Sequence, residues 1–461
     1  MPLCNHRMNL LTRRSILQQS ACGFGWLAFS ALSASKGLAS PLVRPLGDGG
    51  SRSGSFPAKA KRVIFLYMRG GPSHVDTFDY KPELEKADGQ SGPRAGSKWM
   101  KSPWEFRQRG ESGLWISELF PELSKVADDL AIVNSMQTDV PAHAQATVRM
   151  HTGTSQFVRP SVGSWVLYGL GAESESIPGF ISIGPSGSAQ NYGNAFLPAN
   201  YQGMRLGNGN REVDETQISN LAPLVGSERQ RRELDFIQNL NQKKLQTDPA
   251  DQEIEGVIHS YEMAFRMQSE LPKVMNIKSE TEEMQSLYGL DRKETRAFGS
   301  KLLLARRMAE AGVRFIEISQ GSWDHHGNIQ TALASNCEAI DLPLRGLITD
   351  LKQRGMLDET LIVWSGEFGR TPYAQGRDGR DHNHKAFSLW MAGGGVKAGQ
   401  QYGRSGDFGV EATENAIPIV DFHATLLALL GLDHEQLTYP YAGRDFRLTD
   451  TKGRVVTDLI A

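Results

Sequence analysis

The pattern of hydrophobic and polar positions predicts an α/β fold. Short apolar runs bounded by Gly, Pro or polar residues predict buried strands at 62–68, 130–136, 180–183, 313–318, 360–365 and 387–391. Helical periodicity separates them, at 115–129, 141–151, 300–310 and 419–430, and dominates 215–310. This alternation predicts a mostly parallel central sheet with helices on both faces.

The stretch from Gly312 to Met391 carries the densest candidate chemistry. Its first strand ends in Trp323-Asp-His-His-Gly-Asn328, and a long helical pattern follows. Its second strand ends in Gly366-Glu-Phe-Gly-Arg-Thr-Pro372, before Gly379-Arg-Asp-His-Asn-His384. Both strands therefore deliver carboxylate and imidazole groups at their C-terminal ends, where open α/β sheets bind ligands.

The N-terminus predicts an export signal. Thr12-Arg-Arg-Ser-Ile-Leu17 places paired arginines before an apolar run at 22–32, which is the twin-arginine pattern. We expect cleavage after Ala39, with Ala34 as the alternative site, and an N-terminal membrane anchor as the alternative interpretation. The predicted partner is the twin-arginine export machinery, and the predicted location is the periplasm or the extracellular space.

These boundaries predict a signal at 1–39, a linker rich in Gly, Ser, Arg and Pro at 40–61, and one domain at 62–461 with a helical insertion around 215–310. No other stretch is long and apolar enough to span a bilayer, so we expect no stable membrane span once the signal is cleaved.

Charge and cysteine content argue against a nucleic-acid-binding protein and against a disulfide-stabilised one. Lys plus Arg is 50 and Asp plus Glu is 52, a formal net charge of −2, which gives no support for a nucleic-acid partner. Of the 3 cysteines, only Cys337 follows the predicted signal, so no disulfide framework is expected despite export.

Two further strand ends carry candidate residues. The strand at 62–68 runs into Arg69-Gly-Gly-Pro-Ser-His-Val-Asp, which places His74 and Asp76 on a tight loop. The strand at 130–136 precedes a helix that Pro141 would start, with His143 in its first turn. His151 lies two turns further along and cannot share a ligand with His143.

The chain resembles the secreted bacterial "domain of unknown function 1501" family, in the sulfatase and alkaline phosphatase superfamily. The resemblance covers about residue 60 to the end. It is carried by Gly70-Gly-Pro-Ser-His-Val-Asp-Thr-Phe-Asp79, Met150-His-Thr-Gly153, Trp323-Asp-His-His-Gly327, Ser365-Gly-Glu-Phe-Gly-Arg-Thr-Pro372, Gly379-Arg-Asp-His-Asn-His384, Leu426-Leu-Ala-Leu-Leu-Gly431 and Tyr441-Ala-Gly-Arg-Asp-Phe-Arg447.

The superfamily resemblance implies one or two metal ions above the strand ends. It places Asp324 at a metal-ligand position, but Asn328 stands where a His would follow, so His325 or His326 would have to substitute. An Asp-His-Gly motif of the superfamily is similar to Glu367-Phe-Gly369 here. The late His ligand is His382 or His384.

This chain departs from the superfamily's pattern at two positions. The superfamily's nucleophile position falls near His143, and no Ser, Thr or Cys occupies it. The Asp of the first strand becomes Gly70 or Gly71, with Asp76 as a possible replacement.

Together these residues predict a transition-metal site. The predicted ligands are His74, Asp76, Asp324, His325, His326, Glu367, His382 and His384. A mixed carboxylate and imidazole set suits Zn, Mn, Fe or Ni. We assign catalytic roles to His143, Arg69 and Arg370, with the arginines binding an oxyanion through bidentate contacts.

Two functions follow. The first is an exported metal-dependent hydrolase of sulfate or phosphate esters, acting on a small molecule or a glycan, with metal-bound water or His143 as nucleophile. The second is a non-catalytic exported protein that binds a glycan or an anion in a pocket inherited from such a fold. The missing Ser, Thr or Cys and the presence of Phe368 favour the second.

Overall fold

The computed structural model describes residues 57–185, 187–207, 209–211, 226–247 and 252–461. The chain separates into two compact units, of which the larger spans Leu46–Leu197, Tyr201–Gln217 and Ser269–Ala461. The predicted export signal, and the linker up to residue 56, lie outside the described residues.

A 9-stranded sheet forms the centre of the larger unit. Strand β1 lies between β7 and β8 and runs parallel to both, with Phe65 opposite Glu317 on one side and Val363 on the other. Only β11 runs antiparallel, against β4 and β8. The spatial order is β12 (Gln400–Tyr402), β4 (Leu130–Gln137), β11 (Phe387–Ala392), β8 (Thr360–Ser365), β1 (Arg62–Met68), β7 (Phe315–Gln320), β5 (Phe180–Ile183) and β6 (Met204–Leu206), with β13 (Ile417–Pro418) beside β4.

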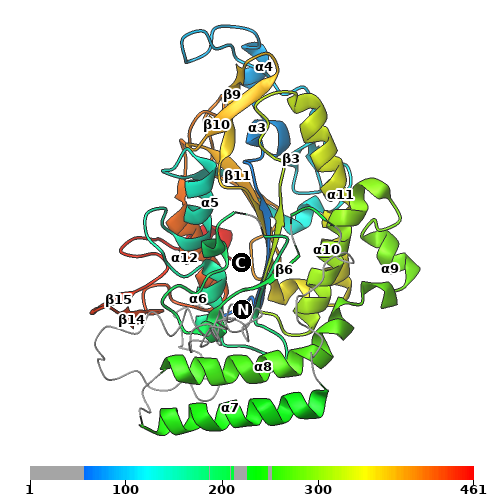
Figure 1. Cartoon of the computed structure of the whole chain (residues 1–461). Helices are drawn as coiled ribbons and strands as arrows, with labels where there is room; N and C mark the ends of the chain where they lie inside the picture. Colours follow the sequence, from blue (N-terminus) through cyan, green and yellow to red (C-terminus); the bar gives the residue numbers. More distant parts are fainter. Residues whose placement is uncertain (1–56, 186, 208, 212–225, 248–251) are drawn as a thin grey trace, which may run out of the picture. The chain divides into compact units, whose positions relative to one another are not determined.

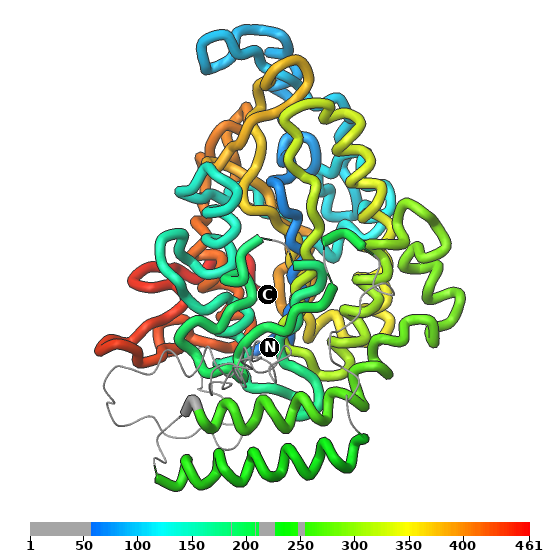
Figure 2. The backbone as a smooth tube through the Cα atoms, viewed as in Figure 1, coloured from blue at the N-terminus to red at the C-terminus, as the bar shows by residue number. Residues whose placement is uncertain are grey.

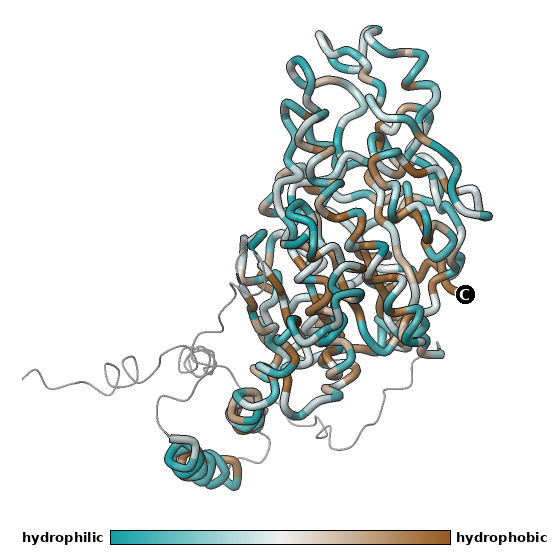
Figure 3. Tube along the Cα trace, turned by 90° about the vertical axis from the view of Figure 1, so that its right-hand side faces the viewer, coloured by the Kyte–Doolittle hydropathy of each residue, from teal (hydrophilic) through white to brown (hydrophobic). Residues whose placement is uncertain are grey.

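Helices cover both faces of this sheet, which confirms the predicted fold class (Figure 1). On one face lie α5 (His143–Thr152), α6 (Val162–Leu170) and α12 (Ile419–Leu429), and on the other lie α10 (Lys293–Glu310) and α11 (Ile329–Gln353). Figure 2 shows β1 threading between segments from much later in the chain. Hydrophobic positions concentrate inside this unit (Figure 3), where β1, α6 and α12 share one core cluster.

The predicted strands all form, and three of them have the predicted bounds: β1, β5 and β8. One local prediction was wrong. Residues 115–129 are not one helix, because Leu114–Ser117 pairs as β3 with β2 (Phe106–Arg109) before a 3-10 helix at Leu123–Asp129. Residues 379–384, for which no element was predicted, contain β10 (Gly379–Asn383), which pairs with β9 (Gly369–Gln375).

The remaining elements are short connections and edges. They are α3 (His74–Thr77), α4 (Pro82–Lys86), α9 (Glu282–Leu287), β14 (Tyr439–Tyr441), β15 (Arg444–Phe446), and 3-10 helices at Ala189–Asn191, Ala199–Tyr201, Ile277–Ser279, Leu357–Glu359 and Thr457–Leu459.

The smaller unit contains α7 (Ser227–Thr247) and α8 (Gln252–Met275) as far as Gln268. The helices meet through polar contacts: Arg231 pairs with Glu262, and the Gln238 amide donates to the Ile258 carbonyl. Within the described ranges, no helix is long and apolar enough to cross a membrane.

Candidate metal site

Three segments bring imidazole and carboxylate groups to one edge of the sheet. His143 is the first residue of α5, which follows β4, and Asp324 and His326 lie in the loop after β7. His382 lies in the β9–β10 hairpin, which follows β8. The sheet points β4, β7 and β8 in the same direction, so these segments meet at the C-terminal edge as predicted.

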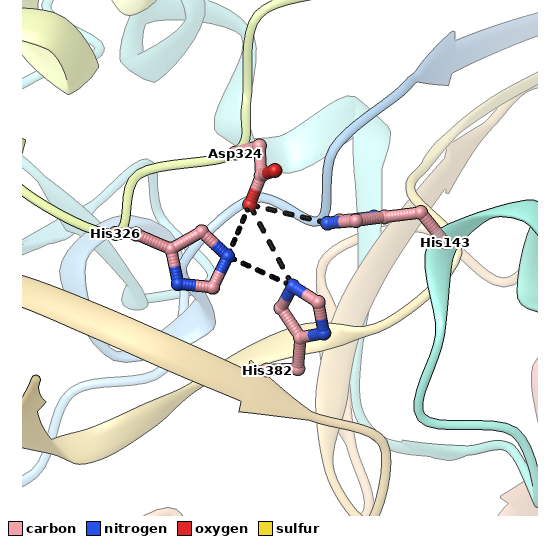
Figure 4. Close-up of side chains that lie close together, drawn as sticks. All are labelled: His143, Asp324, His326 and His382. Carbon is pink, nitrogen blue, oxygen red and sulfur yellow. Dashed lines mark hydrogen bonds and ion pairs between the residues drawn. The ribbon is translucent and has the colours of Figure 1, made fainter.

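One oxygen of Asp324 is the centre of the arrangement (Figure 4). Its Oδ1 lies 3.1 Å from Nε2 of His143, 2.9 Å from Nε2 of His326 and 3.6 Å from Nε2 of His382. The two nitrogens of His326 and His382 are 3.0 Å apart. We call these four residues the His–Asp cluster. Their ligand atoms all lie within 4.8 Å of one another, and no second such group occurs in the part of the chain that the structure describes.

The outer nitrogen of each imidazole faces an acceptor. Nδ1 of His382 lies 2.9 Å from the Pro141 carbonyl, which cannot donate, so this nitrogen carries the proton. Nδ1 of His326 faces the side-chain oxygen of Gln375, and Nδ1 of His143 lies 2.6 Å from Oε1 of Glu367. A neutral imidazole protonated at Nδ1 presents a bare lone pair at Nε2. All three Nε2 atoms point into the cluster, and each would offer its lone pair to a bound ion.

Glu367 holds the outer side of His143. Its carboxylate accepts from the Gly70 amide at 2.9 and 3.1 Å and from the Tyr67 hydroxyl at 3.0 Å. Gly70 has φ +121°, and a Cβ there would lie 2.6 Å from the Asp324 amide nitrogen, so only glycine fits. Glu367 is fully buried and lies one contact outside the His–Asp cluster. It supports His143 rather than pairing with Arg370.

Arg370 supports the carboxylate side. Its buried guanidinium donates to Asp324 Oδ1 at 2.5 Å. It also donates to three backbone carbonyls, those of Gly70, Gly71 and, at 3.2 Å, Arg380. Partial burial opposes ionisation of Asp324, but the Arg370 contact outweighs it and lowers the pKa of Asp324 to about 2. The carboxylate is therefore ionised at any physiological pH.

The two half-buried histidines respond differently to their surroundings. Burial disfavours the imidazolium of His143, but the contacts with Glu367 and Asp324 outweigh it and raise its pKa. Burial lowers the pKa of His382, and the charge of Arg370 acts in the same direction. Phe368, which stands where the resemblance implies a histidine, packs its ring 4.7 Å from both imidazoles.

Several predicted ligands lie elsewhere. Asp76 is fully buried in an ion pair with Arg380, at 2.7 and 2.9 Å. His74 bonds the Gly409 carbonyl at 2.9 Å.

The sequence left two alternatives open: His325 or His326, and His382 or His384. In each case the structure brings only one of the two, His326 and His382, to the cluster. His325 turns toward Asn336, at 3.2 Å, while His326 faces Asp324. Burial and the charge of Arg370 lower the pKa of His325 to about 4. His384 is half-buried and lies outside the cluster. Arg69, which directly precedes Gly70 in the sequence, is exposed.

Three buried polar residues lie beneath the site and were not predicted from the sequence. Tyr67, Thr147 and Glu317 are buried polar side chains within otherwise apolar elements. The sequence could have indicated Glu317, because it is a carboxylate within the apolar strand pattern Phe-Ile-Glu-Ile, where burial is costly without a function or a partner.

The described residues fit a metal ion. Nε2 of His143 is buried and has no hydrogen-bond partner in the described ranges, although it lies 3.1 Å from Asp324 Oδ1. Three imidazole nitrogens and one ionised oxygen form a four-ligand set of the kind that zinc and similar ions take.

One family profile matches most of the chain. A family profile described as "Protein of unknown function (DUF1501)" matches residues 60–460. No curated protein matches the sequence.

Several solved structures are similar to the chain at low sequence identity. The sulfatase PsFucS1 from Pseudoalteromonas sp. is 13% identical, with a TM-score of 0.38, over 96% of this chain and 76% of that one. The alkaline phosphatase of the Antarctic bacterium TAB5 is 10% identical, with a TM-score of 0.33, over 75% and 94%. The lipoteichoic acid synthase LtaP from Listeria monocytogenes is 10% identical, with a TM-score of 0.33, over 86% and 75%. Likeness at this level gives no information about the chemistry of this chain.

Proposed function

The chain belongs to the DUF1501 family, whose function is unknown, and we propose from its site that it is a metal-dependent hydrolase of sulfate or phosphate esters. The observation that supports this most strongly is the convergence of three imidazole Nε2 atoms on an ionised carboxylate. We propose that the His–Asp cluster holds one Zn, Mn, Fe or Ni ion.

An ion held by these four residues would polarise a phosphoryl or sulfuryl oxygen and lower the pKa of bound water toward neutrality. The protein contributes position and charge. Glu367 keeps the proton on Nδ1 of His143, so that Nε2 stays free as a ligand. Arg370 keeps Asp324 ionised and in place.

The site is open on one side, which suits a substrate larger than water. The Asp324 side chain is 45% exposed and that of His326 is 40% exposed, whereas Glu367 and Arg370 are fully buried behind them. Arg370 is occupied by Asp324 and three carbonyls, so it supports the ligand set rather than contacting substrate. Arg69 is exposed and remains the arginine that we propose for the oxyanion.

Water is the attacking group in this proposal. His143 points its Nε2 into the ligand set and is therefore not free to act as a covalent nucleophile. The four residues of the His–Asp cluster include no hydroxyl or thiol that could attack in its place. Attack by water would break the ester bond, with one proton of the water going to the leaving alkoxide to form the alcohol and the other staying on the phosphate or dissociating from the sulfate.

The first test is elemental analysis of residues 40–461, purified without a His tag. Near-stoichiometric metal in the wild type, and its loss in the Asp324→Ala/His382→Ala double variant, are expected. His384→Ala is the matched control, because this neighbouring histidine lies outside the cluster and its loss should leave the metal in place. Hydrolysis of aryl sulfate and aryl phosphate esters is then measured with each of the four ions.

The second candidate function is a non-catalytic binding protein for a glycan or an anion, exported by the twin-arginine route. The packing of Phe368 against both His143 and His382 favours it, since an apolar ring fills the place of a further ligand. Absence of metal after attempted reloading, or metal without hydrolysis of any ester, would support this second function.

A further inference from the structure

Helix α5 presents a polar stripe to the sheet. His143, Thr147 and His151 follow one another at intervals of four residues and therefore lie along one face of the helix. Each meets a polar partner from the sheet side, although a helix face on a sheet is ordinarily apolar. The pairs are His143 with Glu367 at 2.6 Å, Thr147 with Tyr67 at 2.7 Å, and His151 with Glu317 at 3.3 Å.

The middle pair is joined to the first. The single proton of the Tyr67 hydroxyl goes to Oε2 of Glu367, at 3.0 Å, so the Thr147 hydroxyl is the donor to the Tyr67 oxygen. Both residues are buried, with 1% and 5% exposure. Tyr67 therefore ties the carboxylate behind His143 to the second turn of α5.

The last pair lies in the core of the protein. His151 donates from Nδ1 to the Thr147 carbonyl at 2.7 Å, which directs Nε2 to Oε1 of Glu317. The two side chains are 0% and 2% exposed. Neither the other oxygen of Glu317 nor Nε2 of His151 has a hydrogen-bond partner in the described ranges, so the two groups meet as a buried ion pair. Burial disfavours the imidazolium, but Glu317 outweighs it and raises the pKa of His151.

A buried pair of this kind adds little stability. Well-packed apolar side chains of similar volume often stabilise a core equally well or better. What a polar pair adds is directionality, because its contact is lost when the helix slides or turns. The edge of the His151 ring also contacts the Tyr67 ring, at 4.6 Å between centroids, so the last two pairs are in direct contact.

We propose that His151 and Glu317 are positioning residues for the His–Asp cluster, because they fix the axial register of α5 and with it the position of His143. The inference rests on the proposed function. His151 lies about 12 Å along the helix from His143. A slip of one residue moves His143 by about 1.5 Å, whereas metal–ligand distances tolerate only about 0.2 Å.

Cobalt(II) tests this without any assay of activity, because its visible absorption reports the ligand geometry. Wild type, Glu317→Gln and His151→Phe are titrated with cobalt, and affinity and spectrum are recorded. Glu317→Gln keeps the side-chain volume. We expect roughly threefold to tenfold weaker cobalt binding and an altered spectrum in both variants.

The matched control is Tyr288→Phe, which deletes another buried hydrogen bond, at 2.9 Å from Tyr288, directly after α9, to Asp350 of α11; neither helix carries a cluster residue. Its cobalt affinity and spectrum should equal those of the wild type, although its thermal midpoint falls. This separates positioning of the cluster from general loss of stability.

The outcomes distinguish the inference from the proposed function. If the wild type binds no cobalt, the proposed metal centre is wrong. If the wild type binds cobalt, and Glu317→Gln binds it with the same affinity and spectrum, the positioning role is wrong while the metal centre stands. Should His151→Phe fail to fold, the isosteric Glu317→Gln variant decides.

Discussion

Asp76 and His382 are both predicted ligands, and the structure gives them opposite consequences on substitution. Asp76→Ala leaves the buried Arg380 guanidinium without its carboxylate, a loss that costs about 3–5 kcal/mol for buried pairs. Arg380 keeps backbone acceptors, so we expect the lower end of this range. These are the carbonyls of Thr371 at 3.1 Å, Met100 at 3.1 Å and Lys101 at 3.3 Å.

The expected shift in thermal midpoint follows from the size of the chain. An unfolding entropy of about 2.1 cal/mol/K per residue over roughly 400 residues gives about 0.8 kcal/mol/K, so a loss of 3 kcal/mol lowers the midpoint by about 4 °C. His382→Ala removes one partly exposed ring and its bond to Pro141, about 1 kcal/mol, and lowers the midpoint by about 1 °C.

Scanning calorimetry of the metal-free proteins, with elemental analysis of the same samples after reloading, measures both effects. Asp76→Ala should keep its metal and lose about 4 °C of thermal midpoint, and His382→Ala should lose its metal and only about 1 °C of thermal midpoint. Loss of metal in Asp76→Ala without a lower midpoint would refute the reasoning, because Asp76 would then be a ligand and not the partner of Arg380.

Three further outcomes follow from the structure. Glu367→Gln should weaken metal binding about 10- to 100-fold, because the amide is a poorer acceptor for Nδ1 of His143; isothermal titration measures this, and an unchanged affinity would contradict it. Gly70→Ala should destabilise the protein by at least about 1–3 kcal/mol, since φ is +121° and the added Cβ meets Asp324; an unchanged thermal midpoint would show that the loop adapts. Burial lowers the pKa of Lys301 to about 8 in the folded protein, whereas in the unfolded chain the pKa is about 10.4. Between these pH values the unfolded chain binds more protons, so the free energy of unfolding should rise with pH. Melting curves from pH 7 to 10 should show this rise relative to Lys301→Met, and parallel curves would exclude it.

The strand ends that carry the candidate site were predictable because local sequence decides them. Continuous apolar runs such as 62–68 and 360–365 predict central parallel strands, and the polar residues after them must then meet at one edge. The first turn of a helix was likewise predicted to place His143 there. These conclusions need only periodicity and chain direction.

Which side chains face the cluster was not decided by local sequence. His325 and His326 are adjacent, and nothing in their spacing says which one turns toward Asp324. The β9–β10 hairpin decides it, because Gly379 packs directly on the backbone of His326 and the Arg380 amide bonds the carbonyl of His325.

The sequence by itself determined the fold class, the edge of the sheet where chemistry gathers, and the residue types available there. Only the tertiary structure separated the residues that form the cluster from those that support it. Asp76 is captured by Arg380, 304 residues away, and Glu367 is held by Gly70, 297 residues away. The physical reason is that a buried carboxylate takes whichever donors the fold brings to it, and those donors lie far from it in the sequence.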